Sequence, residues 1–168
     1  HKPIQIKDLS LIYPHKTCFE AFSGDIRFGD RIALIGCNGV GKSTLLKILC
    51  GLCPASEGDI NASSEVHFGY LPQVIEEFAS LSGGQRINQV LTKILAEGSN
   101  VLLLDEPTNH LDKRTRHSLM RMLSHYEGTL VIASHDVELI NTVTNTLWHI
   151  ESGTITVFNG SCSFIKAR

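Results

Sequence analysis

The hydrophobic residues of this chain fall into short continuous runs and into segments with one apolar side. The run Val101–Leu104 leads directly into Asp105, and Leu130–Ala133 has the same form. Continuous apolar runs of this length are typical of strands with both faces buried, as in a parallel sheet. Gly84–Ala96 instead places its apolar residues at helical spacing, which predicts an amphipathic helix.

The same criteria predict strands and helices along the whole chain. The expected strands are Ile4–Ile6, Arg31–Ile35, Val66–Tyr70, Val101–Leu104, Leu130–Ala133, Thr146–Ile150 and Thr154–Phe158. The expected helices are Lys42–Leu49, Gly84–Ala96, Lys113–Ser124 and Asp136–Val143. Because strands alternate with helices, we expect an α/β fold with a mainly parallel sheet flanked by helices. The early strands and a final hairpin around Glu151–Gly153 indicate an added antiparallel β portion.

Length, composition and charge fit one globular domain over residues 1–168. The chain is 42% hydrophobic and 19% charged, which is typical of a folded domain rather than a disordered segment. A net charge of −2 gives no overall basic field to attract nucleic acid or an anionic membrane. No apolar run approaches the roughly 20 residues that span a bilayer. The chain also opens without an apolar secretory signal, so we expect no direct membrane insertion.

The cysteines do not form a recognisable framework. There are five, at Cys18, Cys37, Cys50, Cys53 and Cys162. An odd number without regular spacing argues against a set of disulfides and fits a protein of the reducing cytoplasm. Cys50 and Cys53 have the C-x-x-C form of zinc and redox sites. Neither a second ligand pair nor a thioredoxin-like context accompanies them, so chance or packing is the favoured interpretation.

The segment Gly36–Ser43 has the form G-x-x-x-x-G-K-[ST], directly after one expected strand and before an expected helix. This context is the one in which the motif binds nucleotide phosphates, because glycines let backbone N–H groups and the helix N-terminus surround them. Lys42 would contact the β- and γ-phosphates, and Ser43 would supply an oxygen to Mg²⁺. A glycine-rich turn with a chance Lys-Ser does not account for both flanking elements. The expected nucleotide contacts here are Gly36, Asn38, Gly39, Val40, Gly41, Lys42, Ser43 and Thr44.

A second motif follows the apolar run Val101–Leu104. Asp105 and Glu106 stand where that strand ends, which places them at the carboxyl edge of the sheet, beside the phosphate-binding loop. Asp105 would hold Mg²⁺ through water, and Glu106 would polarise the attacking water. Alone, two acids at a strand end could be solvated surface residues. Together with the loop, they predict an ATPase that uses ATP and Mg²⁺.

A third motif, Leu81–Gln85, separates this chain from other nucleotide-binding folds. Leu-Ser-Gly-Gly-Gln precedes a predicted helix and lies shortly before the acidic strand. With the first two motifs it makes the chain resemble the ATP-binding domain of ABC proteins. The elements that match this family, in order, are Tyr13, Gly36–Ser43, Gln73, Leu81–Gln85, Asp105-Glu106, Asp112 and His135. The match covers nearly the whole chain.

The resemblance implies further roles. Tyr13 would stack on adenine, with Phe19 as the substitute. Gln73 would sense Mg²⁺ and the γ-phosphate, and His135 would contact the γ-phosphate and the attacking water. Asp112 would lie at the interface with a second ABC domain. The signature residues that would cover ATP on that opposite domain are Ser82, Gly83, Gly84 and Gln85.

The stretch from Asp105 to Asp112 points to one branch of the family. Its Asn109-His110 pair resembles the F subfamily, soluble paired ATPases of which many act on ribosomes. The closing segment Phe158–Phe164 also resembles that subfamily, although Phe158 and Cys162 replace the usual tyrosines and Asn88 replaces a common arginine. The ATP-binding subunit of a membrane transporter is the alternative, and a non-catalytic scaffold is a third. The basic residues Lys113, Arg114, Arg116 and Arg121 are interpreted as a solvated helix face rather than an RNA contact.

The link between Gln73 and Leu81 is too short for this family. ABC domains usually have a helical subdomain of several dozen residues there. Either the protein lacks that subdomain or the sequence omits a segment of the natural chain, and we favour omission. Omission predicts a break between Cα atoms in this stretch, because a continuous trans step is about 3.8 Å.

Overall fold

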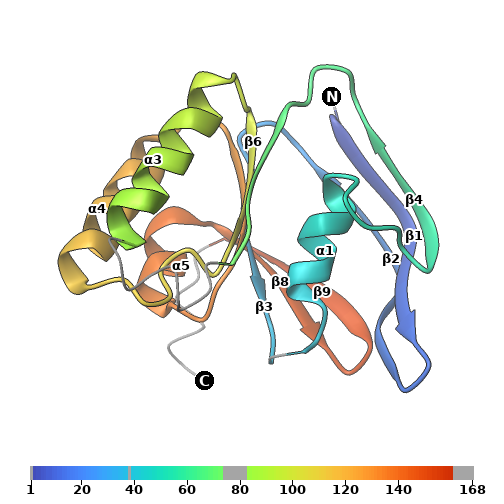
Figure 1. The fold of residues 1–168 in the computed structure, drawn as a ribbon. Coiled ribbons are helices and arrows are strands. Elements are labelled where there is room, and N and C mark those ends of the chain that lie inside the picture. The colour runs from blue at the N-terminus through green and yellow to red at the C-terminus, as the bar shows by residue number, and fades with distance from the viewer. Residues whose placement is uncertain (1, 38, 74–82, 161–168) are drawn as a thin grey trace.

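The computed structural model describes residues 2–37, 39–73 and 83–160. Figure 1 shows its elements, and the labels used below follow that figure. The strands are β1 (Ile4–Tyr13), β2 (Lys16–Ile26), β3 (Arg31–Ile35), β4 (Glu57–Ala62), β5 (Phe68–Leu71), β6 (Val101–Asp105), β7 (Thr129–Ala133), β8 (Thr146–Glu151) and β9 (Thr154–Asn159). The helices are α1 (Lys42–Leu49), α3 (Gly83–Ala96), α4 (Lys113–His125) and α5 (Val137–Val143).

A six-stranded sheet forms the centre of the molecule. Its strand order is β5-β6-β7-β3-β8-β9. The first five strands pair in parallel, and β9 pairs antiparallel with β8 through the predicted hairpin. The predicted α/β class with a mainly parallel sheet is therefore confirmed. The order also brings the carboxyl ends of β5, β6, β7 and β3 to one edge, which is where ligands bind in sheets of this kind.

The central strands are apolar throughout because a separate core covers each face of the sheet. In β6, Val101 and Leu103 pack into the core that contains α1, whereas Leu102 and Leu104 pack into the core under α3, α4 and α5. Figure 1 shows the same division, with α1 on one side of the sheet and the other helices opposite. Each fully buried Leu or Val contributes about 1.5–3 kcal/mol, so this strand is firmly held beneath the site.

The predicted antiparallel portion is a second sheet that covers α1. It has the order β2-β1-β4, and Figure 1 shows it on the far side of α1 from the central sheet. Phe22 of β2 packs edge-to-face on Trp148 of β8 with ring centroids 5.0 Å apart, which joins the two sheets. The expected strand Ile4–Ile6 was too short, and β2 and β4 were not predicted at all.

The remaining elements lie within two residues of their predicted limits. The predicted break between Gln73 and Leu81 falls in a stretch that the structure does not describe. Residues 74–82, which include Ser82, lie outside the described residues. None of the helices in the described part of the chain is long and apolar enough to cross a membrane.

Candidate functional site

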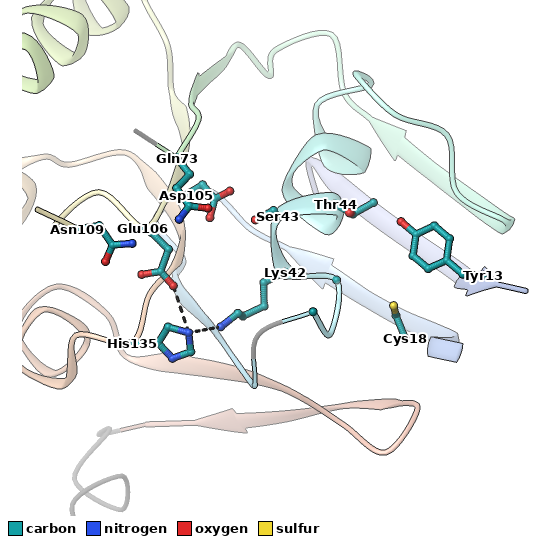
Figure 2. A pocket seen from close by; sticks show the side chains of 12 residues that line it. Tyr13, Cys18, Lys42, Ser43, Thr44, Gln73, Asp105, Glu106, Asn109 and His135 are labelled. Atoms are coloured by element: carbon teal, nitrogen blue, oxygen red, sulfur yellow. Dashed lines mark hydrogen bonds and ion pairs between the residues drawn. The ribbon is translucent and has the colours of Figure 1, made fainter. Parts of the chain in front are cut away.

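One cavity of about 570 Å³ opens at the carboxyl edge of the central sheet. Its residues come from the start of α1, from the loops after β3, β5, β6 and β7, and from the β1–β2 hairpin, as Figure 2 shows for the labelled side chains. The lining residues are Tyr13, Cys18, Gly39, Gly41, Lys42, Ser43, Thr44, Gln73, Asp105, Glu106, Asn109 and His135. Residues as far apart in the sequence as Tyr13 and His135 therefore line the same cavity.

The loop before α1 requires glycine at two positions. Gly41 has φ of 97° and caps α1, and a Cβ there would come within 2.9 Å of Leu11. Gly36 has φ of 152°, and its Cβ would lie 2.7 Å from the carbonyl oxygen of Ile150. Both positions combine a left-handed backbone with a close neighbour, so any side chain would distort the loop. Among the described residues, no side-chain hydrogen bond caps α1, and N–H groups at such a helix end are suited to bind an anion.

Lys42 is buried beneath this loop. Only 7% of the surface of Lys42 is exposed. The Nζ atom donates to the carbonyl of Gly36 at 2.7 Å and lies 3.0 Å from Nε2 of His135 (Figure 2). Burial lowers the pKa of Lys42, and the nearby carboxylates of Glu106 and Asp105 oppose that shift. The ammonium is thus fixed in place with few competing contacts to water.

The two acids at the end of β6 are also buried, with Asp105 3% and Glu106 8% exposed. Glu106 has a left-handed backbone with φ of 45°, and its N–H donates to the carbonyl of Ala133 at 2.8 Å. Burial raises the pKa of Glu106, whereas the charges of His135 and Lys42 and the backbone N–H of His135 lower it. The carboxylate therefore sits in a poorly solvated place from which it can accept a proton or orient a polar ligand.

His135 follows β7 and completes the constellation. Its Nε2 lies 3.5 Å from Oε1 of Glu106, and its side chain is 53% exposed toward the cavity opening. The next residue, Asp136, holds this loop in two ways. Its N–H donates to Oγ of Ser134 at 2.9 Å, and its carboxylate caps α5 at the N–H of Leu139.

The predicted magnesium residues Ser43, Gln73 and Asp105 line the same cavity. They offer a hydroxyl, an amide and a carboxylate oxygen, which are hard ligands suited to Mg²⁺. Among the described residues, no group of three His, Cys, Asp or Glu side chains could hold a metal. That donor set fits an ion that takes few protein ligands and completes its shell with phosphate oxygens and water.

The other predicted site residues have mixed placements. Tyr13 is 47% exposed at the cavity wall, and Thr44 also lines it. Val40 packs against the core instead, and Asn38 lies outside the described residues. Gly83–Gln85 begin α3, but their side chains are not described. The proposal of Phe19 as a substitute for Tyr13 was wrong, because Phe19 is 0% exposed in the core.

Asp112 caps the N-terminus of α4, and the basic residues lie on that helix. The carboxylate of Asp112 accepts from the N–H of Thr115 at 2.7 Å. Hydrogen bonding to the side chain of Thr115, and then to this N–H, lowers the pKa of Asp112. Lys113, Arg114 and Arg121 are exposed, as expected of a solvated face. Arg116 differs because it pairs with Asp136 at 3.2 Å.

The cysteines at 18, 37, 50 and 53 are free, so the C-x-x-C pair forms no disulfide.

The sequence analysis missed two cavity residues. Asn109 lies three positions after Glu106, and its place in the acidic motif was a usable signal. Cys18 had no local signal, because it reaches the cavity only through the packing of β2 against Gly41.

Comparison with known protein families and relatives gives consistent results. A family model described as "ABC transporter" matches residues 19–74, and one described as an AAA domain matches residues 62–141. The chain is 30% identical to the ribosome protection protein VmlR of Bacillus subtilis over 188 positions, covering 98% of this chain and 34% of the relative. It is 34% identical to the erythromycin resistance ATP-binding protein MsrA of Staphylococcus epidermidis over 182 positions, covering 96% and 35%.

A plant relative and a solved structure extend these similarities. The ABC transporter F family member 4 of Arabidopsis thaliana is 30% identical over 210 positions, covering 94% of this chain and 29% of the relative. The chain thus spans about a third of the length of its curated relatives. Alignments of 188 and 210 positions exceed the 168 residues of this chain, so these relatives have residues inside the aligned region that this chain lacks. A solved ABC transporter, described as of the metal-chelate type and inward-facing, matches with a TM-score of 0.78 at 21% identity, over 95% of this chain and 84% of that one.

Proposed function

This chain belongs to the ABC-type ATPases and is most similar to their F subfamily, and we propose how its cavity binds and hydrolyses ATP. The comparisons confirm the predicted family and ATPase class. One observation carries the proposal, namely that Lys42, Asp105, Glu106 and His135 converge on the cavity beside the phosphate-binding loop.

The adenine and the phosphates of ATP are proposed to bind in different parts of the cavity. Adenine stacks on Tyr13, and the phosphates lie along Gly39–Thr44. Lys42 is already held by the Gly36 carbonyl, so its ammonium contacts the β- and γ-phosphates without a large loss of side-chain freedom. Ser43, Gln73 and Asp105 would hold Mg²⁺, which neutralises phosphate charge when it is bound.

The hydrolytic half rests on Glu106. An ionised carboxylate accepts a hydrogen bond from the attacking water and orients it toward the γ-phosphate. His135 lies 3.5 Å from this carboxylate, so it contacts the same water and the γ-phosphate. Removal of the Glu106 charge therefore stops the chemical step and leaves the phosphate-binding loop intact.

A second ABC domain completes the site in this proposal. The signature Ser82–Gln85 of one domain covers ATP on the other, and Asp112 lies at the interface between them. The segment between Gln73 and Leu81 is too short to carry the signature across. Relatives with more residues inside the aligned region than this chain are compatible with a further subdomain in the natural protein, and we propose that it lies between Gln73 and Leu81.

We assign the natural protein to translation, acting on the ribosome from the cytoplasm as a soluble paired ATPase. Similarity to the Bacillus relative, which is named a ribosome protection protein, and the Asn109-His110 pair support this assignment. A transporter subunit is the alternative function. Its support is a solved ABC transporter that is 21% identical to this chain, and similarity at that level shows a shared fold only.

Glu106→Gln in the full-length protein tests both parts of this proposal. The variant should bind Mg-ATP with affinity close to that of the wild type and hydrolyse it at least about 100-fold more slowly. Trapped with ATP, it should co-sediment with ribosomes, and the ADP-bound wild type should not. Hydrolysis at the wild-type rate would exclude Glu106 as the catalytic carboxylate. Normal trapping without ribosome binding would exclude translation but keep the ATPase mechanism.

A further inference from the structure

The β1–β2 hairpin lies along the phosphate-binding loop. Tyr13 at the end of β1 pairs with Lys16 at the start of β2. Lys16 and Cys18 are two residues apart on a strand, so they project to the same side. Nζ of Lys16 donates to the carbonyl of Gly39 at 2.8 Å, and Cβ of Cys18 lies 3.2 Å from the position that a Cβ of Gly41 would occupy. The start of β2 therefore follows the loop from Gly39 to Gly41.

The charges inside the cavity leave a place for another cation. Lys42 is a single positive charge next to two carboxylates, Asp105 and Glu106. The two carboxylates outnumber this buried ammonium at a site that, as proposed, accepts a polyphosphate. Mg²⁺ offsets part of this repulsion, but a nucleotide that arrives also meets the uncompensated acids.

Lys16 is placed to supply that positive charge. Its side chain is exposed, and the ion pairs among the described residues include no carboxylate partner for it. Its ammonium is instead anchored at Gly39, a residue that lines the cavity. The same hairpin carries Tyr13, so an aromatic ring at the cavity wall and a cation bonded to the cavity residue Gly39 come from one element.

We propose that Lys16 is a second cationic group for the phosphates of the bound nucleotide, delivered by the β1–β2 hairpin from the side opposite the acids. This inference rests on the proposed ATP-binding function and adds a residue to it. Lys16 raises affinity through its charge and steers the nucleotide toward the loop. An exposed charge of this kind is worth a factor of about two to five in affinity at low salt.

Three variants separate the charge of Lys16 from its hydrogen bond to the loop. Lys16→Gln removes the charge and keeps an N–H donor for Gly39, Lys16→Met removes both, and Lys16→Arg keeps both. Lys7→Gln is the matched control, because Lys7 is exposed on β1 of the same sheet. It lies six residues from Tyr13, roughly 20 Å along the strand. ATP affinity is measured by calorimetry on the 168-residue chain at about 50 mM and 500 mM salt, with melting curves for each variant.

Charge-based binding predicts that Lys16→Gln and Lys16→Met weaken ATP binding equally, by about two- to five-fold at low salt. The difference should shrink at high salt, where screening lengths are a few Å. Lys16→Arg and Lys7→Gln should match the wild type. Wild-type affinity in Lys16→Gln, or a loss in Lys16→Met that salt does not change, would overturn the inference and leave Lys16 as a support of the loop. Failure of the wild-type chain to bind ATP would overturn the proposed function itself, and the inference with it.

Discussion

The backbone at Glu106 is the most unusual feature of the site at the scale of single residues. Its φ of 45° places a non-glycine residue in the left-handed region, which costs about 1–3 kcal/mol. The N–H bond to the Ala133 carbonyl and the burial of the residue hold this conformation. The turn directs the carboxylate toward His135 and Lys42 instead of along the strand. The strained backbone therefore places the Glu106 carboxylate in the site.

Lys42→Ala should reduce ATP binding by the chain at least about 100-fold, because it removes the buried ammonium that we propose contacts the β- and γ-phosphates. Lys47→Gln is the control, since Lys47 is exposed on the same helix. Calorimetry with Mg-ATP measures both variants. Unchanged affinity in Lys42→Ala would mean that the phosphates lie elsewhere.

Glu106→Gln should raise the melting temperature of the nucleotide-free chain at neutral pH. Burial raises the pKa of Glu106 above its unfolded value of about 4.3. The ionised native state is therefore penalised at pH above the folded pKa, and the amide avoids this penalty. As pH falls through the folded pKa toward the unfolded one, Glu106 takes up a proton and the advantage of the variant should vanish.

The measurement is a series of melting curves from pH 4 to pH 8. Glu97→Gln serves as a control because Glu97 is exposed on the loop after α3. A gap between wild type and Glu106→Gln that widens on acidification would contradict the raised pKa.

Residue identities were predictable where a motif fixed them. Lys42, Ser43, Asp105 and His135 follow strands that end at one sheet edge, so their sequence context placed them together. Lys16 was not predicted, because its approach to Gly39 depends on the register of the β1–β2 hairpin. No pattern within one segment encodes a contact between two segments.

At the scale of elements, prediction succeeded where hydrophobic burial alone decides the structure. The continuous runs of β6 and β7 are buried on both faces and were found almost to the residue. The second sheet was underestimated because bulges at Asp8 and Ala21, both with positive φ, interrupt the alternation of β1 and β2. β4 has one half-buried apolar residue, Ile60, so its sequence shows no strand pattern. Backbone pairing with β1 stabilises it as a strand.

Two arginines hold α4 and α5 at opposite ends. At their C-termini, Arg31 donates to the carbonyls of Leu123, Tyr126 and Val143. At their N-termini, Arg116 contacts both carboxylate oxygens of Asp136, at 3.2 and 3.3 Å. Asp136 directly follows His135, so the second contact also restrains the loop that presents the imidazole.

Arg116→Met should lower the free energy of unfolding by about 1 kcal/mol. The pair is charge-assisted, but its side chains are 23% and 17% exposed, which screens part of the interaction. Urea unfolding measures the loss. Arg121→Met is the matched control, because Arg121 is exposed on the same helix and Met has similar helix propensity. Equal losses in the two variants would assign the effect to helix α4 rather than to the contact with Asp136.

At the scale of the whole molecule, the arrangement of the site is one-sided. Residues of the phosphate-binding loop, the two acids and His135 line the cavity, and we propose that the signature residues of a second domain cover it. Family and fold followed from the sequence because the motifs appear in order over most of the chain. Whether the protein has a helical subdomain between Gln73 and Leu81 could not be derived, because the chain carries only a short link there.

The isolated 168-residue chain should bind Mg-ATP and hydrolyse it very slowly, at a rate per molecule that rises steeply with protein concentration. The γ-phosphate must be covered by Ser82–Gln85 of a second molecule, and a seven-residue tether presents that motif poorly. Without the cover, water remains in the site and the electrostatic stabilisation of the transition state is incomplete. The competent species in this proposal is a dimer, so mass action would control its population. Phosphate release measured from about 1 to 100 μM decides the question, since the rate per molecule of a scarce dimer grows in proportion to concentration. A brisk rate independent of concentration would mean that Lys42, Glu106 and His135 of one domain suffice for hydrolysis and that no composite site is needed.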